Sequence, residues 1–234
     1  MNAANRDLLI RAATALGPLI PDAMFVGGAI VGLLISDYEA TPTRPTDDVD
    51  VAVEVATTID YQLRVGDRLR SLGFEVDTRP HAPICRWRHE DSTVDIMPLD
   101  GEILGFKNEW YRAAFAARES YELTPGLAIL VISAPFFIAT KLEAFSDRGH
   151  GDYLGSADLE DIIAVVDGRG SIVDEARALP PEPRRYLATE FNRLLADRDF
   201  VDALPGHLGY QQAAQNRLTR LTDRLRALSE IDVP

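Results

Sequence analysis

Hydrophobic and polar positions alternate strictly over residues 48–55 (DVDVAVEV). This period of two predicts a β-strand whose alternate side chains share one face. Shorter apolar runs predict further strands at residues 24–26, 74–77, 84–88, 93–97 and 127–132. The polar tetrapeptide at residues 89–92 predicts a turn, so the strands on either side of it are expected to form a hairpin.

Apolar residues at helical spacing predict a first helix at residues 6–16, which ends at Gly17 and Pro18. The same spacing predicts further helices at residues 29–35, 58–72, 102–117, 135–146, 158–166, 184–196 and 211–228. From residue 133 onward the pattern is helical throughout. We therefore predict an α/β (α+β) chain with a mixed sheet flanked by helices in residues 1–133, followed by a helical domain in residues 134–234.

The composition narrows the class of protein. The formal net charge is −13. A protein whose main role is to coat nucleic acid usually carries a basic surface, so this charge argues against that class of protein. No apolar run approaches the roughly 20 residues that cross a bilayer, so we expect a cytoplasmic protein that does not enter the membrane. The single cysteine, Cys85, excludes an internal disulfide, and its place in an apolar–polar run favours a strand residue over a nucleophile.

Three acidic residues on predicted strands are the first candidates for chemistry. Asp48 and Asp50 are two positions apart, so their carboxylates project from the same face, and Asp95 lies between apolar neighbours on another strand. If the two strands are adjacent, three carboxylates converge, which suits magnesium and phosphoryl transfer. The alternative is an ordinary solvated strand face, because an acidic protein places Asp-x-Asp pairs on such faces often.

A Gly-Gly pair, Gly27 and Gly28, lies between a predicted strand and a predicted helix. Glycines at this position allow the backbone to approach a phosphate group. The segment is neither a Walker P-loop nor a dinucleotide-binding fingerprint, and a tight structural turn is the alternative.

Together these motifs resemble the nucleotidyltransferase superfamily typified by DNA polymerase beta, in which Gly-Gly or Gly-Ser precedes Asp-x-Asp on a strand and a third acidic residue on a later strand. The longer segment from Arg44 through Thr46 to Asp50 is similar to the Arg-x-Thr-x-Asp-apolar-Asp motif of the AbiEii and MenT branch, the toxin-like members of bacterial toxin–antitoxin systems. Two further segments of that branch, Lys-x-x-Ala-x-x-x-Arg and Asp-x-x-Asp-apolar, match from Lys141 and from Asp158.

The resemblance implies a role for each matching residue. Asp48 and Asp50 would bind Mg²⁺ or Mn²⁺, and Asp95 would complete the metal site or accept the proton of the acceptor hydroxyl. Gly27, Gly28 and Thr46 would bind the nucleoside triphosphate, and Lys141 would neutralise its charge. Asp158 or Asp161 would orient Lys141 or contact the nucleotide, although Asp158 also suits the first turn of a helix.

The activity implied is metal-dependent transfer of a nucleoside monophosphate from a nucleoside triphosphate to an acceptor hydroxyl. For a toxin-like relative the acceptor is expected to be the 3′ end of a tRNA, and a cognate antitoxin is an expected partner. Two groups of arginines are candidates for docking a tRNA: Arg64, Arg68 and Arg70, and Arg217, Arg220, Arg224 and Arg226. The alternatives are nucleotidylation of a small molecule of the aminoglycoside type or of a protein, or a degenerate module that binds nucleotide without turnover.

Overall fold

The computed structural model describes residues 2–37, 40, 43–105, 107–149, 151–208 and 216–232. The chain divides into two compact units. The first consists of Met1–Ile30 and Arg44–Ser133, and the second of Val31–Thr43 and Ala134–Pro234. The sequence placed the division near residue 133 but did not predict that the segment after Ile30 groups with the helical unit.

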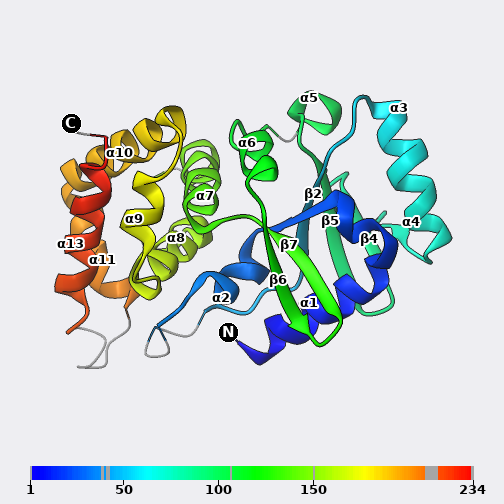
Figure 1. Cartoon of the computed structure of the whole chain (residues 1–234), viewed down its shortest axis with the longest axis horizontal. Helices are drawn as coiled ribbons and strands as arrows, with labels where there is room; N and C mark the ends of the chain where they lie inside the picture. The colour runs from blue at the N-terminus through cyan, green and yellow to red at the C-terminus, as the bar shows by residue number, and fades with distance from the viewer. Residues whose placement is uncertain are drawn as a thin grey trace. The chain divides into compact units, whose positions relative to one another are not determined.

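A seven-stranded mixed sheet forms the centre of the first unit, in the order β3-β4-β5-β2-β1-β7-β6 (Figure 1). Its strands are β1 Ala23–Val26, β2 Val49–Val53, β3 Glu75–Val76, β4 Arg86–His89, β5 Ser92–Pro98, β6 Glu119–Thr124 and β7 Leu127–Val131. The central strand β2 runs antiparallel to β1 and parallel to β5, so the predicted mixed sheet is confirmed. Most residues of the central strands β1, β2 and β5 are buried.

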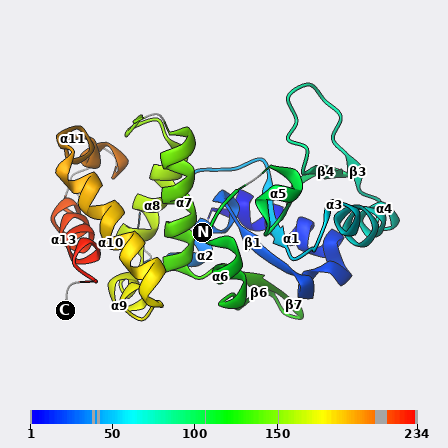
Figure 2. The same cartoon turned by 90° about the horizontal axis from the view of Figure 1, so that it is seen from above.

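Helix α1 (Ala3–Leu16) packs against this sheet and begins where the Asn2 side chain accepts a hydrogen bond from the Ala4 amide. The other helical segments of the unit are η1 Gly17–Asp22, η2 Gly28–Ile30, α3 Thr58–Asp60, η3 Tyr61–Gly66, α4 Asp67–Ser71, α5 Gly101–Leu104 and α6 Tyr111–Ala116. Thr57 caps α3 by accepting a hydrogen bond from the Asp60 amide. Figure 2 shows the connection between β3 and β4 reaching away from the sheet.

One sequence prediction for this unit was wrong, and one strand was missed. The helix expected at residues 102–117 is two short helices, α5 and α6, with Gly105 in a left-handed conformation (φ 80°) at the end of the first. Strand β6 was not predicted, because four of its first five residues are exposed and charged or polar and show no alternation.

The second unit is helical in its described part. It contains α2 Val31–Leu34, α7 Ala134–Arg148, α8 Ala157–Gly168, α9 Ile172–Arg177, α10 Pro181–Ala196, α11 Arg198–His207 and α13 Leu218–Ser229. The helix predicted at residues 211–228 corresponds to α13, although residues 211–215 lie outside the described part of the chain. No helix among the described residues has the length and apolarity needed to cross a bilayer.

The segment after α2 is fixed to the end of α8 in this second unit. The amides of Ser36 and Asp37 both donate to the carbonyl of Gly168, at 3.0 and 2.9 Å. A Cβ atom on Gly168 would lie 2.7 Å from a methyl group of Ile35, so only glycine allows this approach. These contacts explain why residues far apart in sequence form one compact unit.

Candidate active site

Four residues lie in one row across four adjacent strands of the first unit, β4, β5, β2 and β1. Asp50 on β2 is opposite Asp95 on the parallel strand β5, and Asp95 is opposite Arg86 on the antiparallel strand β4. On its other side Asp50 is opposite Val26, the last residue of β1, after which the chain turns at Gly27. Directly opposed residues share a face of the sheet, so the two carboxylates and the guanidinium project to the same side.

Asp48 joins this row from the residue before β2. Its Oδ2 atom accepts a hydrogen bond from Nη2 of Arg86 at 2.5 Å, and its Oδ1 atom accepts from the hydroxyl of Thr46 at 3.0 Å. The structure therefore brings Asp48, Asp50 and Asp95 together on neighbouring strands, as the sequence predicted from their strand positions.

Arg86 links two of these carboxylates and was not identified from the sequence. Its Nε and Nη2 atoms bind Oδ1 and Oδ2 of Asp95, both at 2.8 Å, while Nη2 also binds Asp48. The hydrogen bonds to Asp95 and then the charges of Asp95 and Asp48 outweigh burial and raise the pKa of Arg86 above its ordinary value. The guanidinium is therefore a fixed positive charge in this site.

A buried asparagine positions the chain that enters β2. Asn5 on α1 is fully buried, and its side-chain amide donates to the carbonyl of Arg44 at 3.0 Å and accepts from the amide of Thr46 at 3.1 Å. This pair of bonds fixes Thr46, whose hydroxyl holds Asp48. Thr46 was expected to bind nucleotide, and in this structure its hydroxyl donates to the Asp48 carboxylate.

Gly27 allows the Asp50 carboxylate to lie directly against the main chain. The residue has φ 71°, and a Cβ atom built on it would be only 1.8 Å from Oδ2 of Asp50. Gly28 follows as the first, buried residue of η2. Gly27 is thus required by a close approach of the backbone to a carboxylate.

We expect Gly27→Ala to lower the free energy of unfolding by about 1–3 kcal/mol more than Gly126→Ala, because a side chain is forced into an occupied space. Gly126 has φ 82° and no atom within 4 Å of its built Cβ, so alanine there adds only the left-handed strain of about 1–2 kcal/mol. Urea unfolding of both variants measures the difference. Equal losses would mean that Asp50 moves away from Gly27 without cost.

The donor chemistry of the row fits a divalent cation, since magnesium prefers carboxylate oxygens. The side chains of Asp48 and Asp95 are 30% and 9% exposed, so the first is reachable from solvent. Across the described residues, however, no three acidic, histidine or cysteine side chains are arranged to hold a metal. The three carboxylates lie near one another and are of the ligand type that magnesium prefers, but Arg86 is bound to two of them.

Cys85 lies directly before Arg86 and is 1% exposed. Burial and then the charges of Asp95 and Asp50 raise the pKa of its thiol to about 12, so the thiolate is disfavoured. The residue precedes β4 instead of lying within it, but its carbonyl still accepts from the amide of Ile96.

We expect the folded protein to resist a thiol reagent such as dithiobis(nitrobenzoic acid) at pH 8, and the urea-unfolded protein to react with one equivalent. The absorbance of released thionitrobenzoate measures both. Rapid reaction in the absence of urea would show that this side of the hairpin opens readily in the native state.

The remaining predicted site residues belong to the helical unit. Lys141 on α7 is buried, and its Nζ atom lies 3.0 Å from Oδ1 of Asp158 and 2.8 Å from Oδ2 of Asp161, both on α8. Arg148 at the end of α7 also binds Asp158, at 2.8 Å. The prediction that these aspartates would orient Lys141 agrees with this geometry, in which the lysine charge is matched by two carboxylates.

Asp158 also occupies the first turn of α8, whose N-cap is Ser156. Burial alone would raise the pKa of this aspartate, but Arg148 and Lys141 outweigh it and lower the pKa below its usual value. For Lys141, burial lowers the pKa and the two aspartates more than reverse that change, so the net pKa is raised. Both groups are therefore charged at neutral pH.

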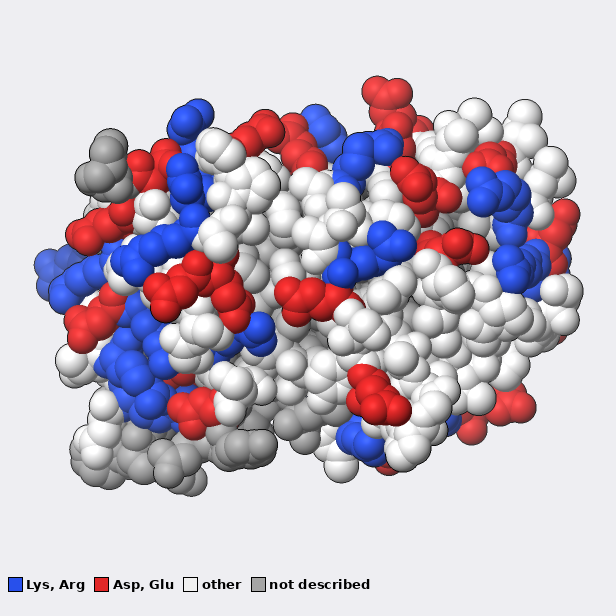
Figure 3. Space-filling model, viewed as in Figure 1, with Lys and Arg blue, Asp and Glu red and all other residues white. Residues whose placement is uncertain are grey.

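All seven arginines considered for tRNA docking already have partners within their own unit. Arg64, Arg70 and Arg226 pair with acidic residues three or four positions before them, and Arg68 donates to a backbone carbonyl. Arg217 and Arg220 bind Asp167 and Asp37, and Arg224 donates to the carbonyls of Val166 and Asp167. On the face drawn in Figure 3, blue and red side chains interleave over these helices.

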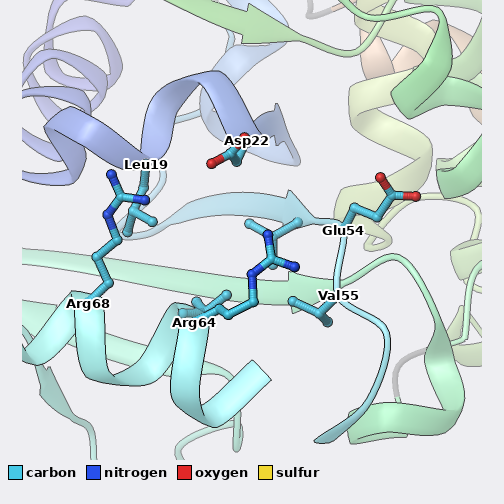
Figure 4. Close-up of a pocket in the computed structure, with 8 residues that line it drawn as sticks. Leu19, Asp22, Glu54, Val55, Arg64 and Arg68 are labelled. Carbon is cyan, nitrogen blue, oxygen red and sulfur yellow. The ribbon is translucent and has the colours of Figure 1, made fainter. Parts of the chain in front are cut away.

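Two cavities of the first unit lie at the C-terminal end of β2, whereas Asp48 lies just before its N-terminal end. One of about 170 Å³ is lined by Leu19, Asp22, Val53, Glu54, Val55, Arg64, Val65 and Arg68, and Figure 4 shows Arg64 reaching toward the space between Asp22 and Glu54. A larger one of about 490 Å³ shares Asp22, Glu54, Val55 and Arg64 with the first and is also lined by Ala56, Asp100, Arg112, Phe115 and Arg118. Neither is lined by the aspartate row, and no sequence motif pointed to them.

The mixed sheet flanked by helices, followed by a helical part, is a nucleotidyltransferase-like fold. Among solved structures, the chain is similar to an antigenic nucleotidyltransferase-like protein from Paracoccidioides brasiliensis. The match has a TM-score of 0.53 and 20% sequence identity and covers 87% of this chain and 93% of that one. No family model and no curated protein sequence matches the chain. At this identity the likeness shows the fold.

Proposed function

We propose that this protein is a metal-dependent nucleotidyltransferase that moves a nucleoside monophosphate from a nucleoside triphosphate to an acceptor hydroxyl. The observation that carries the proposal is the row of Asp50 and Asp95 on adjacent parallel strands, with Asp48 beside it and Gly27 at its edge. A solvated strand face does not account for this arrangement, because Asp95 is buried and a glycine makes room for Asp50.

Asp48, Asp50 and Asp95 would hold Mg²⁺ or Mn²⁺, which would offset the negative charge of the triphosphate during transfer. In the reaction, the acceptor oxygen bonds to the α-phosphorus and the bond from that phosphorus to the leaving pyrophosphate breaks. A carboxylate of the row accepts the proton of the acceptor hydroxyl. Thr46 and Asn5 fix the position of Asp48, and Gly27 leaves room for the Asp50 carboxylate against the backbone.

The motifs beginning at Arg44, Lys141 and Asp158 support placing the protein in the toxin-like AbiEii and MenT branch, with a tRNA 3′ end as acceptor and an antitoxin as partner. A second candidate acceptor is a small cationic molecule of the aminoglycoside type. The net charge of −13 and the internal pairing of the seven arginines favour this second acceptor over tRNA.

The test supplies each α-labelled nucleoside triphosphate in turn with Mg²⁺, and offers total tRNA, cell protein and an aminoglycoside mixture as acceptors. We expect one acceptor class to become labelled and EDTA to abolish labelling, and the labelled class identifies the substrate. Metal-dependent triphosphate binding without any transfer would support the degenerate binding module. Absence of both binding and transfer would refute the proposal.

A further inference from the structure

Arg86 occupies the position between two of the carboxylates that the proposed function assigns to metal. A single atom, Nη2, donates to Oδ2 of Asp48 at 2.5 Å and to Oδ2 of Asp95 at 2.8 Å. A magnesium ion bound by both oxygens would lie about 2.0–2.1 Å from each of them. The guanidinium nitrogen and such a cation would therefore compete for the same space.

The two contacts of Arg86 are unequal. Nε and Nη2 bind Asp95 in a bidentate pair, the geometry in which a guanidinium matches a carboxylate. Only Nη2 binds Asp48. Asp48 is also the more exposed of the two aspartates, with 30% of its side chain accessible against 9% for Asp95. The bond between Arg86 and Asp48 is thus the one that can open while Arg86 stays on Asp95.

We propose that Arg86 is the resident counterion of Asp48 and Asp95, and that a divalent cation binds only when Asp48 leaves Nη2. Arg86 then sets the affinity of the site for metal, since every binding event must break one ion pair and bring two positive charges together. This inference rests on the proposed function, because it assumes that the aspartates are metal ligands.

The experiment is a Mn²⁺ titration followed by electron paramagnetic resonance, on wild type, Arg86→Gln and Arg88→Gln. Arg88 is exposed and lies two residues further along β4, so its replacement changes the net charge equally without touching Asp48 or Asp95. We expect Arg86→Gln to bind Mn²⁺ at least about tenfold more tightly than wild type, the lower end of what one neighbouring charge does at a carboxylate. Arg88→Gln is expected to match wild type.

Arg86→Lys is the second variant, because it keeps the charge but loses the fork and provides a folded comparison if Arg86→Gln does not fold. We expect it to bind Mn²⁺ less tightly than Arg86→Gln and more tightly than wild type. Circular dichroism checks the fold of each variant.

Equal Mn²⁺ affinity in wild type and the Arg86 variants would overturn the inference and leave the proposed function intact. Weaker binding in these variants would also overturn it, since Arg86 would then assemble the metal ligands instead of competing with the metal. Absence of Mn²⁺ binding in every folded protein, with and without a nucleoside triphosphate, would count against the metal site itself and so against both.

Discussion

Replacing Lys141 with methionine is expected to lower the free energy of unfolding by about 3–5 kcal/mol, the usual cost of removing one partner of a buried ion pair. The lysine side chain is 10% exposed, and those of Asp158 and Asp161 are 6% and 3% exposed. Methionine fills similar space, so packing is largely kept while two carboxylates lose a shared cation. Urea unfolding monitored by circular dichroism measures the loss.

The matched control is Lys107, the other lysine of the chain. Its side chain is 75% exposed and pairs with Glu109 at 3.4 Å, so Lys107→Met should change the free energy of unfolding by less than about 0.5 kcal/mol. A loss below about 1 kcal/mol for Lys141→Met would show that the fold does not need this charge. That result would support the role in nucleotide binding which the resemblance implies.

The same ion pairs predict how stability depends on pH. The pKa of Asp158 is lowered in the folded state, so its contribution is complete above the ordinary aspartate value near 4 and is lost as pH falls through the lower folded value. Lys141→Met removes one cause of that shift, and the penalty of the substitution should therefore shrink as pH falls below about 4. Urea midpoints of both proteins between pH 3 and 7 measure the trend, and a constant penalty would contradict it.

The sequence predicted those parts of the fold in which burial imposes a clear pattern. The alternation around Asp48 and Asp50 was read correctly because β2 is central, with apolar residues on its buried face. Strand β6 lies at the edge of the sheet and exposes most of its side chains, so no burial imposes a pattern on its sequence. The helix expected at residues 102–117 is interrupted because Gly105 takes a left-handed conformation that no apolar spacing reveals.

The candidate site, like the fold, could be predicted from the sequence only in part. The three aspartates were found because each interrupts an apolar strand, whereas Arg86 resembles any strand arginine. Its role follows from register: the turn at Glu90 and Asp91 pairs His89 with Ser92, and counting back along the hairpin places Arg86 opposite Asp95. The sequence contained that information once a two-residue turn was assumed. The buried Asn5 could not have been found in this way, because its partners lie about 40 residues away.

Asp50→Asn is expected to reduce nucleotide transfer about a thousandfold, since losing a carboxylate that holds charge at a phosphoryl-transfer site removes about 4 kcal/mol of transition-state stabilisation. Asparagine has the shape of aspartate and still fits against Gly27. Because Asp50 and Asp95 are directly opposed like charges, the variant should be at least as stable as wild type. The variant would then lose activity without losing stability, as expected for a residue that is needed for catalysis but destabilises the fold.

Asp47→Asn is the control, because Asp47 is exposed and lies three residues before Asp50. It removes the same charge from the same segment and should leave both transfer and melting temperature unchanged. Labelled-triphosphate transfer and thermal unfolding of the two variants give four numbers, and only one, the transfer rate of Asp50→Asn, is expected to fall. If that rate stayed within about threefold of wild type, the aspartate row would not be the catalytic centre, since a metal ligand contributes far more than this. A fall in the melting temperature of Asp50→Asn alone would instead make Asp50 a structural residue, held by its contact with Gly27.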